Sequence, residues 1–220
     1  MIKPVEMEGI SFLFDLDGVV FDTEGQYTDL WMKIGQRYFN DRDLCLRIKG
    51  MTLVQIFDSY FPGNVSAQRE IREMLSRFEK EMDYEYVPGV RSFLESLRQK
   101  DVRTAIITSS DRPKMENVYR AHPEIRDLFS AIFTGEDFSR SKPAPDCYLM
   151  GMKAFGSAPE DTYIFEDSFN GLTAARDSGG NVIALATTNP RNAVAPYAGL
   201  VTDDFTGLTP ESVIESFHRK

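Results

Sequence analysis

Two carboxylates lie at the end of an apolar run near the start of this chain. Asp15 and Asp17 follow Phe12-Leu13-Phe14 and precede Gly18. Alternate residues of a strand point to the same side, so both carboxylates would project together if the strand geometry persists to its tip. Such a pair can hold a divalent cation, act as nucleophile and base, or do both. The alternative is a strand-to-turn junction in which Asp and Gly only shape the turn.

A second acidic pair has the same position relative to another apolar run. Glu166 and Asp167 end the run that begins at Thr162. Mg²⁺ prefers hard oxygen ligands, with few carboxylates and several waters. The alternative is that Asp167 or Ser168 only caps the helix that follows. The expected magnesium ligands are Asp15, the main-chain carbonyl of Asp17, Asp167 and, directly or through water, Glu166.

Three hydroxyl residues follow a third apolar run. Thr108, Ser109 and Ser110 come directly after the stretch 102–107. Hydroxyls and free backbone N–H groups between a strand and a helix suit a phosphate group. The alternative is an ordinary helix N-cap made by Ser110 or Asp111.

One lysine lies in a stretch of backbone that prolines restrict. Lys142 precedes Pro143 and Pro145. The prolines restrict the backbone conformations of the residues around Lys142, so the next helix is expected to begin only after them. A lysine held in this way could neutralise a phosphate, whereas most lysines in loops are only solvated.

Apolar runs and helical stretches alternate along most of the chain. This order predicts an α/β fold, with a Rossmann-like parallel sheet and helices on both of its faces. The predicted strands are Ile10–Asp15, Val102–Thr108, Ala131–Thr134, Thr162–Glu166, Asn181–Ala186 and Leu200–Thr202. The predicted helices between them are Val90–Gln99, Pro113–Ala121, Asp146–Phe155, Gly171–Ser178 and Pro210–Phe217.

Residues 21–85 interrupt this alternation and contain no convincing strand. Apolar residues at helical spacing predict a long amphipathic helix around 67–82, a short one at 53–60 and a third over 22–39. We therefore expect an all-helical insert after the first strand. The chain returns from it through a Pro-Gly turn at 86–89.

All four polar loops follow strands of the one predicted sheet. Ligands of open α/β sheets bind at the carboxyl ends of the strands, so these loops should meet at one edge. They would bring a nucleophilic carboxylate, a neighbouring carboxylate, a hydroxyl, a lysine and a metal-binding pair into one small volume. This is the set of groups that phosphoryl transfer requires.

The overall composition narrows the choice of partner and compartment. The 220 residues carry a formal net charge of −9, which disfavours nucleic acid or an anionic membrane as the partner. Cys45 and Cys147 form no CxxC pattern, and neither a signal peptide nor an apolar stretch long enough to cross a membrane is found. Taken together with the phosphoryl-transfer groups described above, this leads us to expect a cytoplasmic monomer that acts on a small phosphorylated metabolite.

Together these motifs resemble the haloacid dehalogenase (HAD) superfamily over essentially the whole chain. The residues that carry the resemblance are Asp15-Leu16-Asp17-Gly18-Val19-Val20, Thr108, Lys142 and Glu166-Asp167, in this order. Four stretches are similar to the branch that contains beta-phosphoglucomutase and small-metabolite phosphatases: Asp22-Thr23-Glu24, Lys49-Gly50, Ser141-Lys142-Pro143-Ala144-Pro145-Asp146 and Glu166-Asp167-Ser168. The resemblance implies a HAD core of residues 1–20 and 86–220, with a helical cap of residues 21–85.

The resemblance also implies a Mg²⁺-dependent mechanism with a covalent intermediate. Asp15 would attack phosphorus and form an aspartyl-phosphate, while Asp17 would protonate the leaving oxygen and then deprotonate the attacking water. An unperturbed aspartate titrates near ~3.9, so Asp17 is expected to have a raised pKa. Lys142 would steady Asp15 and the transferring group, and Thr108 with adjacent N–H groups would bind phosphoryl oxygens.

Two phosphoryl-transfer reactions remain open within this branch. Its mutases need a second phosphate-binding group in the cap, and they have an arginine where this chain has Leu53 and a histidine where it has Tyr27. We therefore expect hydrolysis of a sugar or polyol phosphate. A mutase is the alternative, because Arg47 could replace the missing arginine. The residues expected to face the substrate are Thr23, Lys49, Gly50, Ser109 and Ser110.

Two other functions on the same scaffold are disfavoured. Dehalogenases need no metal and usually lack the second aspartate, whereas this chain has Asp17 and the pair at 166–167. A non-catalytic metabolite-binding module would be expected to have lost Asp15, Asp17 or Lys142, and none of them is lost.

Overall fold

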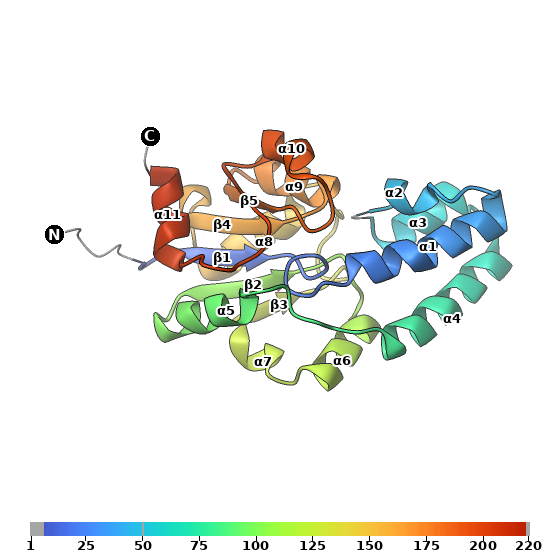
Figure 1. The fold of residues 1–220 in the computed structure, drawn as a ribbon, viewed down its shortest axis with the longest axis horizontal. Helices are drawn as coiled ribbons and strands as arrows, with labels where there is room; N and C mark the ends of the chain where they lie inside the picture. The colour runs from blue at the N-terminus through green and yellow to red at the C-terminus, as the bar shows by residue number, and fades with distance from the viewer. Residues whose placement is uncertain (1–6, 50, 219–220) are drawn as a thin grey trace.

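A parallel sheet places the polar loops. The computed structural model describes residues 7–49 and 51–218. Six strands lie in the order β3-β2-β1-β4-β5-β6, and all neighbouring pairs are parallel (Figure 1). The strands are β1 Ser11–Phe14, β2 Arg103–Ile107, β3 Ala131–Phe133, β4 Thr162–Glu166, β5 Asn181–Leu185 and β6 Leu200–Thr202. The predicted α/β fold is confirmed, and each predicted strand end lies within one residue of the observed end.

Helices cover both faces of the sheet. They are α5 Val90–Gln99, α6 Arg112–Ala121, α7 Ile125–Leu128, α8 Asp146–Phe155, α9 Phe169–Asp177, α10 Arg191–Val194 and α11 Pro210–His218, with 3₁₀ turns at Pro159–Asp161 and Ala195–Tyr197. The sequence predicts neither α7 nor α10, because a single turn is too short for a 3.6-residue apolar period to show. Within the described ranges, no helix has both the length and the apolar character needed to cross a membrane.

The pleat of the strands divides the apolar core of the sheet into two clusters. Phe12 and Phe14 belong to the cluster that includes side chains from α5, α6, α7 and α11, whereas Leu13 belongs to the cluster with α8, α9 and α10. All three side chains are fully buried, and Phe14 stacks on Phe165 with 4.9 Å between ring centroids. Burial on both faces explains why β1 is apolar at successive positions until it reaches the acidic residues.

The helical insert predicted after the first strand is present. Its helices are α1 Glu24–Phe39, α2 Leu44–Arg47, α3 Leu53–Tyr60 and α4 Val65–Glu81. They enclose a third apolar cluster, which includes Trp31, Phe57 and Ile71 and is separate from the two clusters at the sheet. Figure 1 shows the insert beyond the carboxyl end of the sheet. The domain division at residues 20/21 and 85/86 stays a prediction, which the separate cluster supports.

Two adjacent linkers join the insert to the sheet. The N–H of Asp22 donates to the carbonyl of Glu85 at 2.8 Å, and the N–H of Val87 donates to the carbonyl of Val20 at 3.0 Å. Both pairs lie in the segments that connect β1 to α1 and α4 to α5. The two crossing points of the chain therefore support each other directly at the base of the insert.

The placement of β1 in the core can be tested by stability measurements. Leu13→Ala should lower the free energy of unfolding by about 2–5 kcal/mol, because the truncation leaves a cavity beside α8. Leu149→Ala is the matched control, since Leu149 on α8 is 44% exposed; its truncation should cost less than about 1 kcal/mol. Urea denaturation of both variants measures the difference. Equal losses would contradict the buried position of Leu13.

Candidate active site

A cavity of about 950 Å³ lies between the carboxyl edge of the sheet and the inserted helices. From the sheet side its lining includes Asp15, Asp17, Thr108, Ser109, Lys142 and Asp167. From the insert it includes Tyr27, Trp31, Lys49, Leu53 and Leu75. The four polar loops therefore do meet at one edge of the sheet, as their positions after the strands predict.

Lys142 joins the first and last of the acidic motifs. Its Nζ lies 2.7 Å from Asp15 Oδ1 and 2.5 Å from Glu166 Oε1, and it donates to the carbonyl of Ile107 at 3.1 Å. The side chain is 2% exposed. Burial alone would lower the pKa of Lys142, but the two carboxylates raise it above its ordinary value. The lysine is therefore charged and holds Asp15 at the tip of β1.

Glu166 anchors this lysine from the far side. Its Oε1 also accepts from the hydroxyl of Tyr148 at 2.7 Å, and its Oε2 accepts from the N–H groups of Asp167 and Ser168 at 3.0 and 3.2 Å. A Cβ at Gly171 would lie 1.8 Å from Glu166 Oε1, so only glycine leaves room for the carboxylate. Both oxygens of Glu166 are thus already hydrogen-bonded within the protein.

Three carboxylates form a group that could hold a metal ion. One oxygen each of Asp15, Glu166 and Asp167 lies within 4.8 Å of the others. Asp167 Oδ2 also accepts from the hydroxyl of Thr188. Ser168 and not Asp167 caps α9, which leaves the Asp167 carboxylate for the cavity. Hard oxygen donors of this kind suit a divalent cation such as Mg²⁺.

The pKa values of Asp15 and Asp167 are raised. Burial, reinforced by Glu166 and Asp17 and opposed by Lys142, raises the pKa of Asp15 to about 7. Burial and the nearby charges of Glu24, Glu166 and Asp15 raise the pKa of Asp167 well above its ordinary value. Crowded, buried carboxylates repel each other, and a bound divalent cation would relieve that repulsion. This electrostatic state supports the expected metal site.

Asp17 lies in the same cavity but outside the three-carboxylate group. Both of its oxygens lie 2.5 Å from Lys114 Nζ, and they also accept from the hydroxyls of Thr23 and Ser110. Burial favours a higher pKa, but the lysine and these hydrogen bonds outweigh it and lower the pKa of Asp17. The expectation of a raised pKa is wrong for this reason: the sequence does not show that Lys114 reaches the carboxylate. Its main-chain carbonyl stays a predicted metal ligand.

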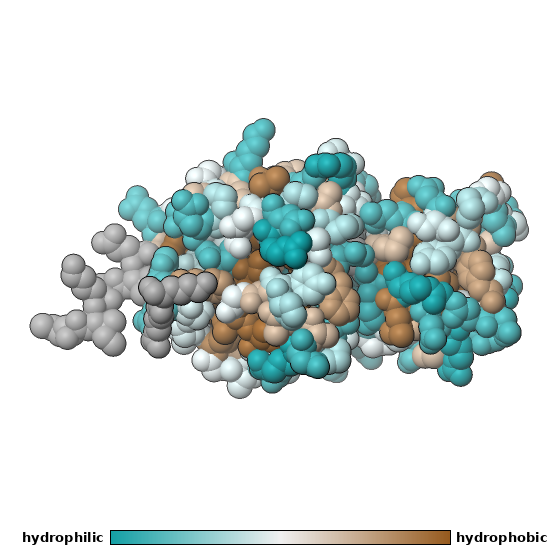
Figure 2. Space-filling model, turned by 90° about the horizontal axis from the view of Figure 1, so that it is seen from above, coloured by the Kyte–Doolittle hydropathy of each residue, from teal (hydrophilic) through white to brown (hydrophobic). Residues whose placement is uncertain are grey.

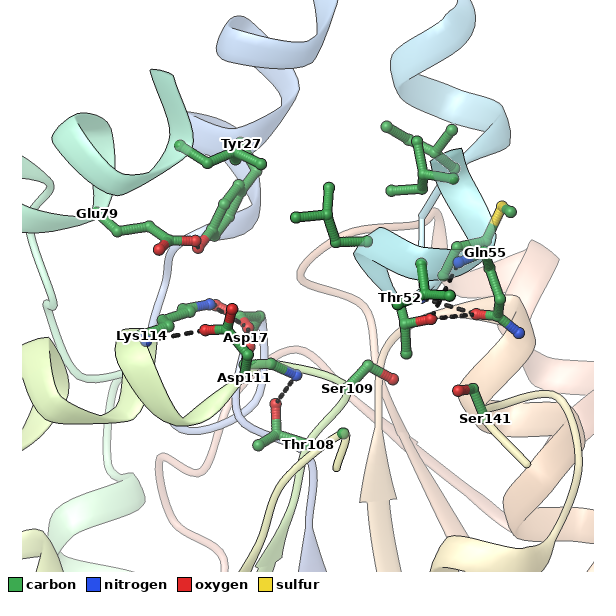
Figure 3. Close-up of a pocket in the computed structure, with 18 of the residues that line it drawn as sticks. Asp17, Tyr27, Thr52, Gln55, Glu79, Thr108, Ser109, Asp111, Lys114 and Ser141 are labelled. Atoms are coloured by element: carbon green, nitrogen blue, oxygen red, sulfur yellow. Dashed lines mark hydrogen bonds and ion pairs between the residues drawn. The ribbon is translucent and has the colours of Figure 1, made fainter. Parts of the chain in front are cut away.

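The hydroxyl loop after β2 presents two unused donors to the cavity. Thr108 Oγ1 accepts from the N–H of Ser110 at 3.0 Å, which leaves the hydroxyl proton of Thr108 free to donate. Ser109 Oγ is buried without a hydrogen-bond partner among the described residues, and Figure 3 shows it directed into the cavity. Asp111 provides the N-cap of α6 by accepting from the N–H of Lys114. Both hydroxyl protons are therefore free to donate, and phosphate binding by this loop stays a prediction.

The residues of the insert that are predicted to face the substrate do not all line the cavity. Lys49 lines the cavity, and its Nζ lies 3.3 Å from Glu24 Oε2. Thr23 is fully buried and donates to Asp17, so in this structure it supports that carboxylate and does not line the cavity. Gly50 lies outside the described residues.

Side-chain hydrogen bonds hold the insert against the sheet. Gln55 Nε2 donates to the carbonyl of Lys142 at 3.3 Å, and Asn170 Nδ2 donates to the carbonyl of Lys49 at 3.0 Å. The first bond connects α3 with the loop that contains Lys142, and the second connects α9 with the loop before α3. The insert is therefore seated directly over the cavity.

Sequence reasoning missed several residues that complete the site: Lys114, Tyr148, Thr188 and Asn189. Asn189 Nδ2 donates to the carbonyl of Asp167 at 2.9 Å. The stretch Thr187-Thr188-Asn189 follows β5, so the rule that identified the loop after β2 could have found it. Lys114 and Tyr148 lie within helices, where residue type and spacing carry no signal of an active-site contact.

Comparison with known proteins agrees with this geometry. A sequence model of the haloacid dehalogenase-like hydrolase family matches residues 12–185. The chain belongs to the haloacid dehalogenase-like hydrolase family. This HAD protein is 29% identical over 180 residues to a phosphorylated carbohydrates phosphatase of Thermotoga maritima, over 76% of this chain and 80% of that protein. It is 28% identical over 212 residues to the mitochondrial (DL)-glycerol-3-phosphatase 1 of Arabidopsis thaliana, over 90% of this chain and 71% of that protein.

The HAD fold itself is shared with solved structures of the same branch. The crystal structure of a beta-phosphoglucomutase from Clostridium difficile superposes with a TM-score of 0.78, covering 94% of this chain and 96% of that chain at 21% identity. At this identity the likeness shows the fold alone. Together with the family match, it confirms the resemblance inferred from the four motifs.

Metal binding at the acidic group should depend on pH. A carboxyl whose pKa is raised in the folded state stabilises the protein most at low pH, and that contribution is lost as pH rises through about 7 for Asp15. Mg²⁺ binds the ionised form, so it should raise Tm more at about pH 8 than at about pH 5.5. Thermal melts with MgCl₂ and with EDTA measure the shift.

The variants for this test separate the site from general charge effects. Asp15→Asn and Asp167→Asn should each reduce the Mg²⁺-dependent shift in Tm at the higher pH. Asp203→Asn is the control, because Asp203 is exposed and pairs with Arg191; it should keep the shift of the parent chain. An equal Mg²⁺ effect in all the variants would contradict the assigned site.

Proposed function

We propose that this HAD protein is a Mg²⁺-dependent phosphatase that hydrolyses a small phosphorylated metabolite through an aspartyl-phosphate on Asp15. The observation that carries the proposal is the buried contact between Asp15 and Lys142 beside a second acidic loop. Together, Asp15, Lys142 and the acidic loop present an oxygen nucleophile, a fixed cation and oxygen donors for a metal at one end of a cavity. Phosphoryl transfer needs these groups in this arrangement.

In the first half-reaction, an Asp15 oxygen bonds to phosphorus as the ester P–O bond breaks. Asp17 delivers a proton to the leaving oxygen, and a phosphate dianion nearby favours the protonated form of this carboxyl. Thr108 and Ser109 donate hydrogen bonds to phosphoryl oxygens. Asp15, Asp167 and Glu166 would hold a Mg²⁺ here, which would supply positive charge to offset that of the phosphoryl group and the carboxylates.

In the second half-reaction, water attacks the phosphorus of the aspartyl-phosphate. Asp17 accepts a proton from that water, and the bond between phosphorus and the Asp15 oxygen breaks to release inorganic phosphate. Lys142 stabilises the Asp15 carboxylate as it leaves. Asp17 is ionised at this stage because it has already given its proton to the leaving group, so it is in the form that accepts a proton.

Hydrolysis is favoured over the mutase alternative by the insert side of the cavity. Leu53 offers no charge there, and the hydroxyl of Tyr27 donates to Glu79 at 2.9 Å. Arg47 pairs with Asp41 at an exposed position and is not among the lining residues, so it does not replace the missing arginine. At the positions of Leu53 and Tyr27 the cavity therefore has neither the arginine nor the histidine of the mutases, and the nearby Lys49 is already paired with Glu24.

A sugar or polyol phosphate is the proposed substrate class. The relatives named for phosphorylated carbohydrates and for glycerol 3-phosphate support this choice. The seated insert also favours small esters over phosphoproteins, since it covers the cavity.

We further propose that the protein acts as a cytoplasmic monomer. Cys45 and Cys147 are buried free thiols, which suit a reducing compartment. The exposed large apolar side chains are distributed over different elements, and isolated positions of this kind do not require a partner.

The phosphatase proposal predicts Mg²⁺-dependent release of inorganic phosphate from p-nitrophenyl phosphate, sugar phosphates and glycerol 3-phosphate. Asp15→Asn should lower kcat by at least about 10³-fold, because the nucleophile is lost. Asp203→Asn serves as the control and should keep full activity. Retention of activity by Asp15→Asn, or no release by the parent chain from any ester, would contradict the proposal.

The mutase alternative has its own assay. Glucose 1-phosphate is supplied with catalytic glucose 1,6-bisphosphate, and glucose 6-phosphate and free phosphate are measured together. We expect free phosphate to form faster, because Leu53 and Tyr27 line the cavity where the mutases have an arginine and a histidine. Faster formation of glucose 6-phosphate would reverse the assignment.

A further inference from the structure

Lys114 is a buried cation that the reaction described above does not use. It lies in α6, its side chain is 3% exposed, and its Nζ lies 2.5 Å from each carboxylate oxygen of Asp17. A buried charge is costly unless it is paired, so the ion pair explains how the lysine is tolerated. The N-cap contact from Asp111 to the N–H of Lys114, at 2.9 Å, fixes the start of the helix that carries it.

The same ammonium group also contacts the insert. Its Nζ lies 4.5 Å from the centroid of the Tyr27 ring on α1, a cation–π distance. The hydroxyl of Tyr27 in turn donates to Glu79 on α4 at 2.9 Å. Figure 3 shows the order Asp17, Lys114, Tyr27 and Glu79 along one side of the cavity. Lys114 therefore connects the loop after β1 with α1 directly, and with α4 through Tyr27.

The other donors to Asp17 cannot replace this contact. Thr23 donates to Oδ1 and Ser110 donates to Oδ2, so each hydroxyl restrains one oxygen. Lys114 alone contacts both oxygens and carries the charge that balances the carboxylate. Its removal would leave a nearly buried carboxylate with two neutral donors and freedom to rotate.

We propose that Lys114 is a positioning residue for Asp17, and that its contact with Tyr27 makes this positioning depend on the seating of the insert over the sheet. The inference rests on the proposed phosphatase function, because it assigns a role within that reaction. The acid–base carboxylate is aligned when α1 and α4 are docked, and it loses its bidentate partner when Tyr27 moves away with them. Closure over a substrate and alignment of Asp17 are then one event.

A double-mutant cycle tests the first part of the inference. With p-nitrophenyl phosphate and saturating Mg²⁺, Lys114→Met and Lys114→Gln should lower kcat by about 10- to 100-fold, within the range that positioned acid–base groups contribute. KM should change by less than about threefold, because the lysine is not a substrate ligand. In an Asp17→Asn background, the same Lys114 substitutions should have no further effect on the residual rate. Lys153→Met, at an exposed position on α8, controls for the loss of one positive charge.

The Tyr27 side chain tests the second part. Tyr27→Leu removes the ring and should lower kcat more than Tyr27→Phe, which keeps the ring but loses the hydrogen bond to Glu79. The extra loss in Tyr27→Leu should disappear when Lys114 is already Met or Gln. An equal loss for both Tyr27 variants would overturn the coupling.

The outcomes separate this inference from the proposed function. An active parent chain whose Lys114 variants keep kcat within about threefold would overturn the inference and leave the phosphatase assignment intact. A further loss on combining the Lys114 and Asp17 substitutions would also overturn it, since Lys114 would then act independently of Asp17. A parent chain that hydrolyses no ester would instead contradict the proposed function.

Discussion

The arrangement of the candidate active site depends on one buried ammonium group that lies between two carboxylates. Lys142 holds Asp15 at the tip of the central strand and is itself held by Glu166, which is bonded to Tyr148 and to two backbone N–H groups. Without the lysine, two carboxylates would lie close together in a nearly dry pocket, which is strongly unfavourable. The ion pair therefore fixes the nucleophile and makes the acidic edge of the sheet compatible with folding.

The two aspartates after β1 have different environments because each has its own lysine. Asp15 shares Lys142 with Glu166 and lies near other carboxylates, and its pKa is raised to about 7. Asp17 has Lys114 to itself together with two hydroxyl donors, and its pKa is lowered. Two identical side chains, two residues apart, can thus take different roles through their surroundings. The lysines come from opposite sides of the site, one from the loop before α8 and one from α6.

Much of this arrangement could be predicted from the sequence, because it follows from local rules. Apolar strands that end in polar residues fixed the sheet edge at which Asp15, Thr108, Lys142 and Asp167 meet, and helical spacing identified the insert. The Lys114 contact could not be predicted, since it depends on the rotation of α6 relative to β1. The lowered pKa of Asp17 was missed for the same reason. The sequence predicts that Thr23 faces the substrate. Its burial against Asp17 could not be predicted, because it follows from the path of the linker and not from the residue type.

The central claim is that the Asp15 carboxylate, held by Lys142, captures the phosphoryl group. Acid quenching during turnover, followed by proteolysis and mass spectrometry of the peptide that contains Asp15, tests it most directly. We predict the mass increase of one phosphoryl group on Asp15 in the parent chain, and none in the Asp15→Asn variant. Turnover without any phosphorylated peptide, or a phosphoryl group on a different residue, would contradict the account.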